Sequence, residues 1–145
     1  TGTIPMTADR PQKGVLDTNI LIHWASLGEA LLPMQPAVTA VTLAELSAAV
    51  HGGLTGEGRA RRMELLQRVE STFDPLPFDV AAARAYGRIA SAARALGRSP
   101  RSRALDQMIA AIAATRGLPL YTTNAGDFVG LEGIVQVVAV DRPTA

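Results

Sequence analysis

The chain has 145 residues, which is enough for one domain with a substantial core and too few for two ordinary domains. Hydrophobic residues make up 48% and charged residues 19%, so the composition excludes disorder over most of the length. The absence of cysteine excludes disulfides, thiolate zinc sites and a cysteine nucleophile. No apolar run approaches the roughly 18 residues of a membrane span, and the start of the chain lacks a signal-peptide pattern. We therefore expect a cytoplasmic protein.

The net charge of +1 is unevenly distributed along the chain. Residues 84–116 hold seven arginines and one acid, Asp106, so this segment carries +6 and the remainder carries −5. Six formal charges on one stretch suggest a polyanionic partner. A solvated helix face is the alternative, and charge alone favours neither.

The N-terminal part of the sequence predicts a leader followed by a strand and a helix. Residues 1–13 contain prolines and polar residues without periodicity, so we expect a flexible leader and a single domain over residues 14–141. Residues 14–16 form a short apolar run that stops at a polar Asp-Thr-Asn trio. This pattern predicts a buried strand that leads into a helix over residues 20–27.

Strands and helices alternate along the rest of the chain. We expect strands over residues 37–41, 118–122 and 134–140, and helices over residues 42–52, 59–72, 79–96 and 102–117, the third of them capped by Asp79. Residues 73–78 contain two prolines and fit only a short edge strand or a loop. Alternation of this kind predicts an α/β fold, with a central parallel sheet flanked by helices. In such sheets ligands bind beyond the carboxyl ends of the strands, where this sequence places polar residues.

Four acids are candidates for chemistry, and each also has a purely structural interpretation. Asp17 is placed to cap the helix that follows it. Glu45 and Thr42 have the spacing of a capping box, in which the glutamate reaches back to its own helix start. Asp106 lies where a carboxylate complements a helix dipole, and Asp127 fits a turn. Taken singly, each signal is weak.

Taken together, the acids lie in four motifs in a fixed order. The motifs are Val-Leu-Asp-Thr-Asn around Asp17, Thr-Leu-Ala-Glu-Leu around Glu45, Asp-Gln-Met-Ile-Ala-Ala from Asp106, and Thr-Thr-Asn-Ala-Gly-Asp-Phe around Asp127. The set resembles the PIN-domain nucleases, and within them the VapC toxins of bacterial toxin–antitoxin pairs. The resemblance runs from about residue 14 to residue 140, which is nearly the whole chain.

The resemblance implies a Rossmann-like α/β/α fold whose acids converge on Mg²⁺ or Mn²⁺ for endoribonucleolytic cleavage of RNA. Hard divalent ions take oxygen ligands, so a few carboxylates suffice without histidine or cysteine. Two unit charges 4 Å apart repel by about 4 kcal/mol at an effective dielectric of 20, so a bound cation would explain the gathering of four acids. The resemblance also implies a VapB-type antitoxin partner and a homodimer. It is compatible with tRNA or ribosomal RNA as the substrate, and with one ion or two.

Supporting roles follow from position within the motifs. Members of the family carry the fourth acid at one of two places, and because this chain has an amide at Asn124 we assign the acid to Asp127. The residues expected to orient ligands or a metal-bound water are Thr18, Asn19, Thr122 and Asn124. The residues expected to hold RNA phosphates near Asp106 are Arg98, Arg101 and Arg103.

Two other functions compete with the nuclease. A phosphatase of the haloacid dehalogenase type also begins with a strand that ends in aspartate, but it needs a second acid where this chain has Asn19. Its site also needs a lysine, and Lys13 is the only lysine in the chain. A non-catalytic module that binds RNA or an antitoxin is the second competitor. The presence of an acid in all four motifs favours the enzyme.

Overall fold

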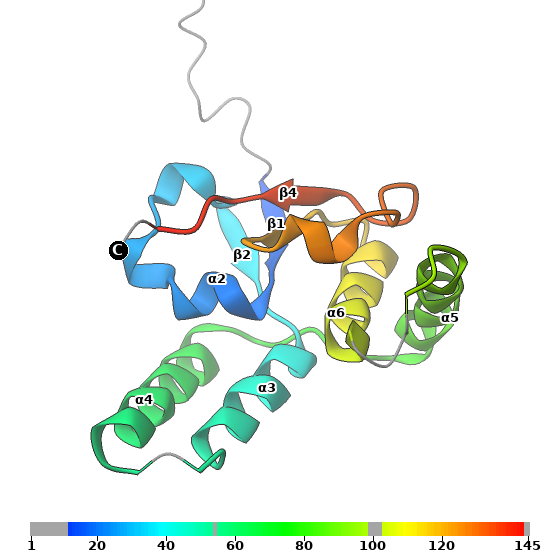
Figure 1. The fold of residues 1–145 in the computed structure, drawn as a ribbon. Coiled ribbons are helices and arrows are strands. Elements are labelled where there is room, and N and C mark those ends of the chain that lie inside the picture. The colour runs from blue at the N-terminus through cyan, green and yellow to red at the C-terminus, as the bar shows by residue number, and fades with distance from the viewer. Residues whose placement is uncertain (1–11, 54, 99–102, 144–145) are drawn as a thin grey trace, which may run out of the picture.

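The computed structural model describes residues 12–53, 55–98 and 103–143. Within these residues, four parallel strands form one sheet in the order β2-β1-β3-β4 (Figure 1). The strands are β1 (Lys13–Leu16), β2 (Gln35–Ala37), β3 (Leu120–Thr122) and β4 (Val137–Ala139). The predicted α/β fold with a central parallel sheet is therefore confirmed.

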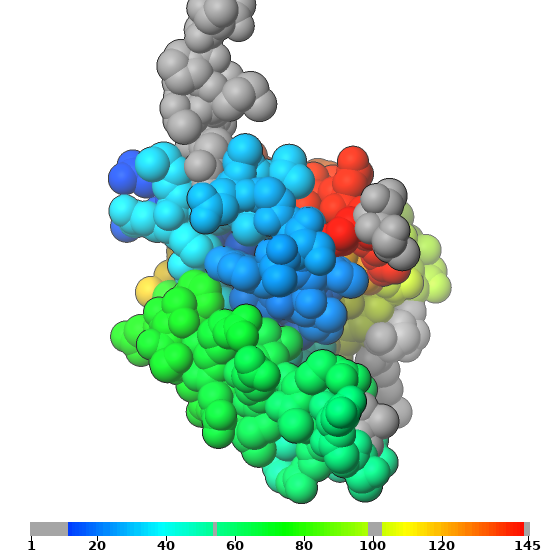
Figure 2. Space-filling model, turned by 90° about the vertical axis from the view of Figure 1, so that its left-hand side faces the viewer, coloured from blue at the N-terminus to red at the C-terminus, as the bar shows by residue number. Residues whose placement is uncertain are grey.

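Helices cover both faces of this sheet. The α-helices are α2 (Thr18–Ile22), α3 (Ala40–Val50), α4 (Gly56–Thr72), α5 (Val80–Ala95) and α6 (Ala104–Thr115). Short 3₁₀ helices are η1 (Trp24–Ser26), η2 (Glu29–Leu31) and η4 (Ala125–Phe128). Figure 1 shows α5 and α6 packed together on one side of the molecule, with α4 on the other side. Figure 2 shows α4, in green, across one face below α2 and the segment that follows it, in blue.

Alternating side chains on the central strands divide the core into two clusters. Val15 and Leu120 are fully buried in a cluster with residues of α5 and α6. Leu16 and Tyr121, the next residues along the same strands, are buried in a second cluster with residues of α2, α3 and α4. Successive side chains of a strand point to opposite faces of the sheet, so the two clusters lie on its two sides. The result is a three-layer α/β/α arrangement whose parallel strands share one carboxyl edge.

The first strand begins at Lys13, one residue before the predicted start. Residues 1–11 lie outside the described part of the chain, so the leader and the boundary at residue 14 stay predictions. A Cβ atom on Gly14 would lie 2.6 Å from the ring of Tyr121 on the neighbouring strand. Because that ring is buried in the core, the close approach of β1 to β3 requires glycine at this position.

The prediction for residues 37–42 was wrong. The second strand is Gln35–Ala37, and α3 begins at Ala40 rather than at Thr42. The side chain of Thr39 is the N-cap of α3, since its Oγ1 accepts a hydrogen bond of 3.1 Å from the backbone N–H of Thr42. Strand pairing therefore ends before the apolar residues that suggested a longer strand.

Other boundaries differ by a few residues. Asp17 caps α2, which starts at Thr18 and ends at Ile22, so the helix predicted over residues 20–27 is shorter and continues only as η1. The strands predicted over residues 118–122 and 134–140 pair over only three residues each. Residues 73–78 form a loop with one isolated bridge to the residue before α3. The predicted helix start at residue 102 lies outside the described residues.

The long alanine-rich helix begins where it was expected. Asp79 is the N-cap of α5, and its carboxylate accepts a hydrogen bond of 2.9 Å from the backbone N–H of Ala82. The alanines of the inner face let α5 pack closely on α6. No helix in the described ranges is long and apolar enough to cross a membrane.

Candidate active site

Asp17 lies directly after β1, at the carboxyl edge of the sheet, and is only 3% exposed. Its Oδ1 accepts a hydrogen bond of 2.8 Å from the backbone N–H of Thr18, and its Oδ2 accepts one of 2.8 Å from Thr122 Oγ1 and one of 3.2 Å from Asn19 Nδ2. Burial raises the pKa of Asp17, and the negative charge of Asp127 adds to the rise, while these donors oppose it. Asp17 is thus both the cap of α2 and a desolvated carboxylate that neighbouring side chains hold in place.

The capping-box interpretation of Glu45 is wrong. Because α3 starts at Ala40, Glu45 is the sixth residue of the helix and lies in its second turn, beyond reach of the helix start. Its Oε1 instead accepts a hydrogen bond of 2.7 Å from Thr18 Oγ1, on a different helix. Burial raises the pKa of Glu45, and the charge of Asp17 adds to that rise.

A chain of threonine hydroxyls leads to Glu45. Thr18 Oγ1 lies 3.0 Å from Thr42 Oγ1, which lies 3.5 Å from Thr39 Oγ1. A hydroxyl has one proton to donate, and Thr18 donates its proton to Glu45, so Thr42 donates to Thr18 and Thr39 to Thr42. Sequence reasoning missed Thr42 and Thr39 as site residues. The only available signal was the position of Thr42 one helical turn before Glu45.

Asp106 lies in the first turn of α6, where the negative charges of the other three acids act on it. Its pKa is raised to about 6, first by burial and then by the negative charges of Asp17, Glu45 and Asp127, while Arg103 opposes the rise. No described residue donates a hydrogen bond to its carboxylate. The other three predicted acids therefore lie near enough to Asp106 for their charges to raise its pKa.

Asp127 is held by arginines. It lies in η4, and its carboxylate forms an ion pair with Arg103, the residue before α6. Arg98 Nη1 donates a hydrogen bond of 3.3 Å to the backbone carbonyl of Asp127. Arg101, which was also expected to bind RNA, lies outside the described residues.

The positively charged segment of residues 84–116 divides into two parts. Arg84, Arg88 and Arg94 are exposed on α5, as expected of a solvated helix face. Arg98 and Arg103 are half-buried against η4, next to the acids. Only the second part has a direct structural link to the candidate site.

Polar side chains join the end of β1 to the end of β3. Asn19 Nδ2 donates a hydrogen bond of 3.2 Å to Thr122 Oγ1, and Asn19 Oδ1 accepts one of 3.0 Å from the backbone N–H of Thr123. Thr122 Oγ1 also accepts a 3.0 Å hydrogen bond from the backbone N–H of Asn124. The side-chain oxygen of Asn124 accepts a hydrogen bond from Arg142, which sequence reasoning missed. The predicted supporting residues thus fix the orientation of the strand ends and of Asp17.

Comparison with known proteins identifies the family. The family model of the PIN domain matches residues 14–130. The chain belongs to the PIN-domain family. This PIN domain is similar to Ribonuclease VapC5 of Mycobacterium tuberculosis, with 42% identity over 130 residues that cover 88% of this chain and 93% of the relative. It is also similar to the tRNA(fMet)-specific endonuclease VapC of Shigella flexneri, with 33% identity over 129 residues, or 84% of this chain and 94% of that protein.

The fold of this PIN domain is also found in a solved structure of the VapBC family of toxin–antitoxin systems, VapBC-5 from Mycobacterium tuberculosis. The TM-score is 0.79 at 41% sequence identity, and the match covers 90% of this chain and 100% of that chain. The resemblance to the VapC group that the four motifs indicate is therefore confirmed.

The donor set of this PIN domain suits a hard divalent cation. Within the described residues, no group of three or more His, Cys, Asp or Glu side chains is arranged so that it could hold a metal ion by itself. Mg²⁺ is ordinarily held by one or two carboxylates together with waters and substrate phosphates, so it needs no such cage. Asp106, which lacks a hydrogen-bond donor among the described residues and faces the charges of three carboxylates, fits a cation best.

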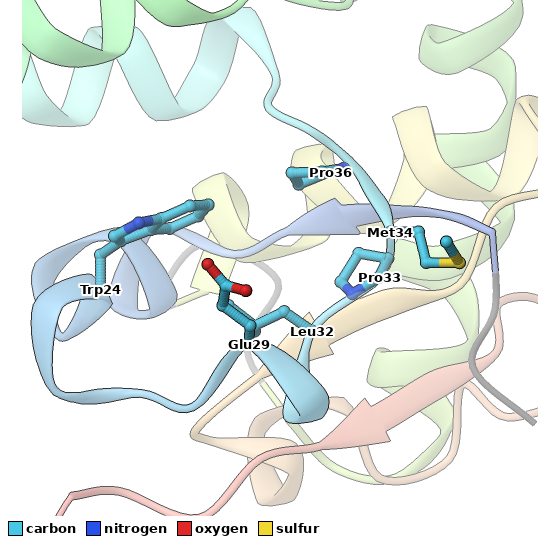
Figure 3. A pocket seen from close by; sticks show the side chains of 6 residues that line it. All are labelled: Trp24, Glu29, Leu32, Pro33, Met34 and Pro36. Atoms are coloured by element: carbon cyan, nitrogen blue, oxygen red, sulfur yellow. The ribbon is translucent and has the colours of Figure 1, made fainter. Parts of the chain in front are cut away.

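A separate cavity of about 320 Å³ lies beside the edge strand β2 of this PIN domain (Figure 3). Its lining residues are Trp24, Glu29, Leu32, Pro33, Met34 and Pro36. None of them is a predicted site residue. This cavity is therefore separate from the candidate active site.

Proposed function

We propose that this PIN domain is a Mg²⁺- or Mn²⁺-dependent endoribonuclease and the toxin of a toxin–antitoxin pair. The observation that carries the proposal is the raised pKa of Asp106, to which the charges of Asp17, Glu45 and Asp127 all contribute. Such mutual repulsion destabilises a metal-free fold and is relieved by a bound cation. The relatives named Ribonuclease VapC5 and tRNA(fMet)-specific endonuclease VapC support RNA as the substrate.

In this proposal one or two carboxylates of the set Asp17, Glu45 and Asp106 hold the cation together with waters and substrate phosphates, and Asp127 is the fourth acid of the site. When bound, a divalent cation there lowers the pKa of a coordinated water and offsets negative charge on the phosphate in the transition state. A carboxylate has about four lone-pair sites, and hydrogen bonds occupy two on Oδ2 of Asp17 and one on Oδ1. The remaining site is on Oδ1, so this oxygen is the atom of Asp17 that is available to a cation.

Neighbouring residues fix the geometry of these carboxylates. Thr122 and Asn19 orient Asp17, and the hydroxyl of Thr18 orients Glu45. Carboxylates held in place before the substrate binds lose little freedom when they act, which favours catalysis. The polar residues around the acids are thus proposed to position ligands, as the family resemblance implies.

We extend the proposal to partners through the family relation. The VapBC-5 structure comes from a toxin–antitoxin system, so we propose a VapB-type antitoxin as a partner of this chain. We also propose a homodimer, for which alanine-rich helices such as α5 allow close packing between two copies. Arg98, half-buried beside the acids, is proposed to attract the RNA backbone, whereas Arg103, which is paired with Asp127, is proposed to position that acid.

Sequencing of RNA ends in cells tests the endonuclease proposal. Induction of the wild-type chain is expected to create new internal RNA ends at a small set of sites, whereas induction of the Asp106→Asn variant to the same level should create none. Because the substitution removes a charge and leaves the side-chain shape, both proteins should accumulate folded. Identical end profiles after the two inductions would contradict the proposed activity.

A further inference from the structure

Three arginines from separate parts of the chain contact the short segment of residues 124–127, which leads into and includes most of η4. Arg98 follows α5, Arg103 precedes α6, and Arg142 follows β4. This segment borders the acids. The backbone N–H of Asn124 donates a hydrogen bond to Thr122, which in turn donates one to Asp17, and the negative charge of Asp127 raises the pKa of Asp106. Arginine side chains thus surround one side of the acidic site.

The three arginines differ in what they bind. Arg103 forms an ion pair with the carboxylate of Asp127, so its charge is matched. Arg98 donates hydrogen bonds to backbone carbonyls, at 3.3 Å to Asp127 and 3.5 Å to Gly126. Arg142 donates to the side-chain oxygen of Asn124. Among the described residues, neither Arg98 nor Arg142 lies within ion-pair distance of a carboxylate. Their contacts hold the guanidinium groups in place without neutralising them.

The anchored arginines retain donors for another ligand. A guanidinium has five N–H donors, and Arg98 uses two of them and Arg142 one in the contacts above. Arg142 is exposed and Arg98 is half-buried, so solvent reaches both side chains. A planar guanidinium with free donors matches the oxygens of a phosphate, often in a bidentate contact. The remaining donors therefore suit phosphate groups.

We infer that Arg98 and Arg142 bind backbone phosphates of single-stranded RNA, so that the substrate runs from the acids across residues 124–127 toward the C-terminal segment. The inference rests on the proposed ribonuclease function and adds the direction in which the RNA leaves the site. Arg142 becomes a substrate-binding residue that no sequence motif indicated. Arg103 is instead a positioning residue, because its ion pair fixes Asp127 relative to the start of α6, one turn before Asp106.

A counter-charge role is the alternative. Arg98 and Arg142 would then only offset repulsion between the acids in the free protein. That role predicts lower thermal stability without them and an unchanged salt dependence of RNA binding. If the two arginines contact phosphates, their removal should make the salt dependence of RNA binding shallower, because each contact releases counterions from the RNA and steepens that dependence.

The test is RNA binding by the full chain in EDTA, which prevents metal-dependent cleavage. Fluorescence anisotropy with a labelled single-stranded oligoribonucleotide, over a series of KCl concentrations, gives the slope of log K against log salt. The variants are Arg98→Ala, Arg142→Ala and the double substitution. Arg116→Ala is the matched control, because Arg116 is exposed at the far end of α6, about 15 Å along the helix from Asp106.

Each of Arg98→Ala and Arg142→Ala is expected to lower the magnitude of the slope by about 0.7 and to weaken binding about fivefold at 0.1 M salt. The double variant should lower the slope by about 1.4, and Arg116→Ala should leave it unchanged. An unchanged slope in the double variant would overturn the inference, and a lower melting temperature alongside it would identify the counter-charge role. If the double variant does not fold, the slope measured for Arg142→Ala alone decides, because Arg142 is exposed: an unchanged slope in that variant would overturn the inference.

The same experiment separates this inference from the proposed function. Wild-type cleavage of the oligoribonucleotide with Mn²⁺, together with unchanged slopes in the variants, would overturn the inference and leave the ribonuclease proposal standing. A wild-type chain that neither binds nor cleaves RNA would overturn both.

Discussion

Replacement of Asp106 by asparagine is expected to lower the rate of RNA cleavage at least about a thousandfold. The substitution keeps the shape of the side chain and removes the charge that attracts a cation. A metal ion supplies several kcal/mol of transition-state stabilisation, and each 1.36 kcal/mol changes a rate tenfold. Asp17→Asn and Glu45→Gln should have losses of similar size, because each removes one carboxylate from the same site. Initial rates on a labelled RNA with saturating Mn²⁺ measure the effect.

Asp79→Asn is the matched control for these substitutions. Asp79 caps α5, outside the acidic site, and asparagine caps a helix about as well as aspartate. Its rate should equal that of the wild type. For Glu45→Gln, the amide oxygen still accepts the hydrogen bond from Thr18, so a loss of rate without a loss of folding isolates the charge. Full activity in Glu45→Gln would remove Glu45 from the metal site.

Thermal stability is expected to depend strongly on divalent metal. A ligand at a hundredfold excess over its dissociation constant stabilises the folded state by about 2.7 kcal/mol, which for a chain of this size raises the melting temperature by about 8 °C. Asp106→Asn should melt higher than the wild type in EDTA, because it relieves the repulsion from three carboxylates, and should gain less from Mn²⁺. Melting curves of both proteins at fixed ionic strength provide the measurement.

Protonation should relieve the same repulsion. The pKa of Asp106 is about 6 in the folded protein and 3.8 without the fold, so between these values the folded state binds more protons than the unfolded state. The metal-free wild type should therefore lose stability as the pH rises through about 6, and Asp106→Asn should lose less. A wild type that is insensitive to Mn²⁺ and more stable than Asp106→Asn in EDTA would show that the acids do not converge.

The sequence predicted where the acids meet because strand polarity follows from the alternation of strands and helices. Parallel strands end at one edge, so Asp17 after β1 and Thr122 at the end of β3 were expected at the same edge, and the pairing of β1 with β3 makes them neighbours. The hydrogen bond between them, at 2.8 Å, follows from that placement. The order of the four motifs added Glu45 and Asp106 through resemblance.

The start of α3 could not be predicted from local signals. Thr42 and Glu45 satisfy the capping-box spacing, while Thr39 has no glutamate or glutamine three residues later. A distant segment decides between them, since Leu76 pairs with the residues on either side of Thr39: its N–H donates to the carbonyl of Val38 and its carbonyl accepts from Ala40. The helix therefore starts at Ala40, and Glu45 turns toward Thr18. Contacts between residues so far apart in the sequence leave no local pattern.

The contacts of the arginines could not be predicted from the sequence either. Arg103 and Asp127 are 24 residues apart, and Arg142 and Asn124 are 18 apart. No periodicity links such positions, because η4 and the segment after β4 are irregular and pack by tertiary contact. The net charge of residues 84–116 indicated a partner, but it did not distinguish the exposed arginines of α5 from those beside the acids.

The most direct test of the central claim is RNA cleavage by the purified wild-type chain during removal and return of metal. The claim is that clustered carboxylates at the carboxyl edge of the sheet hold a divalent cation for hydrolysis of RNA. Cleavage of a labelled RNA should stop in excess EDTA and return when Mn²⁺ or Mg²⁺ is added beyond the chelator, while Asp106→Asn stays inactive throughout. Cleavage that continues unchanged in excess EDTA would contradict the claim.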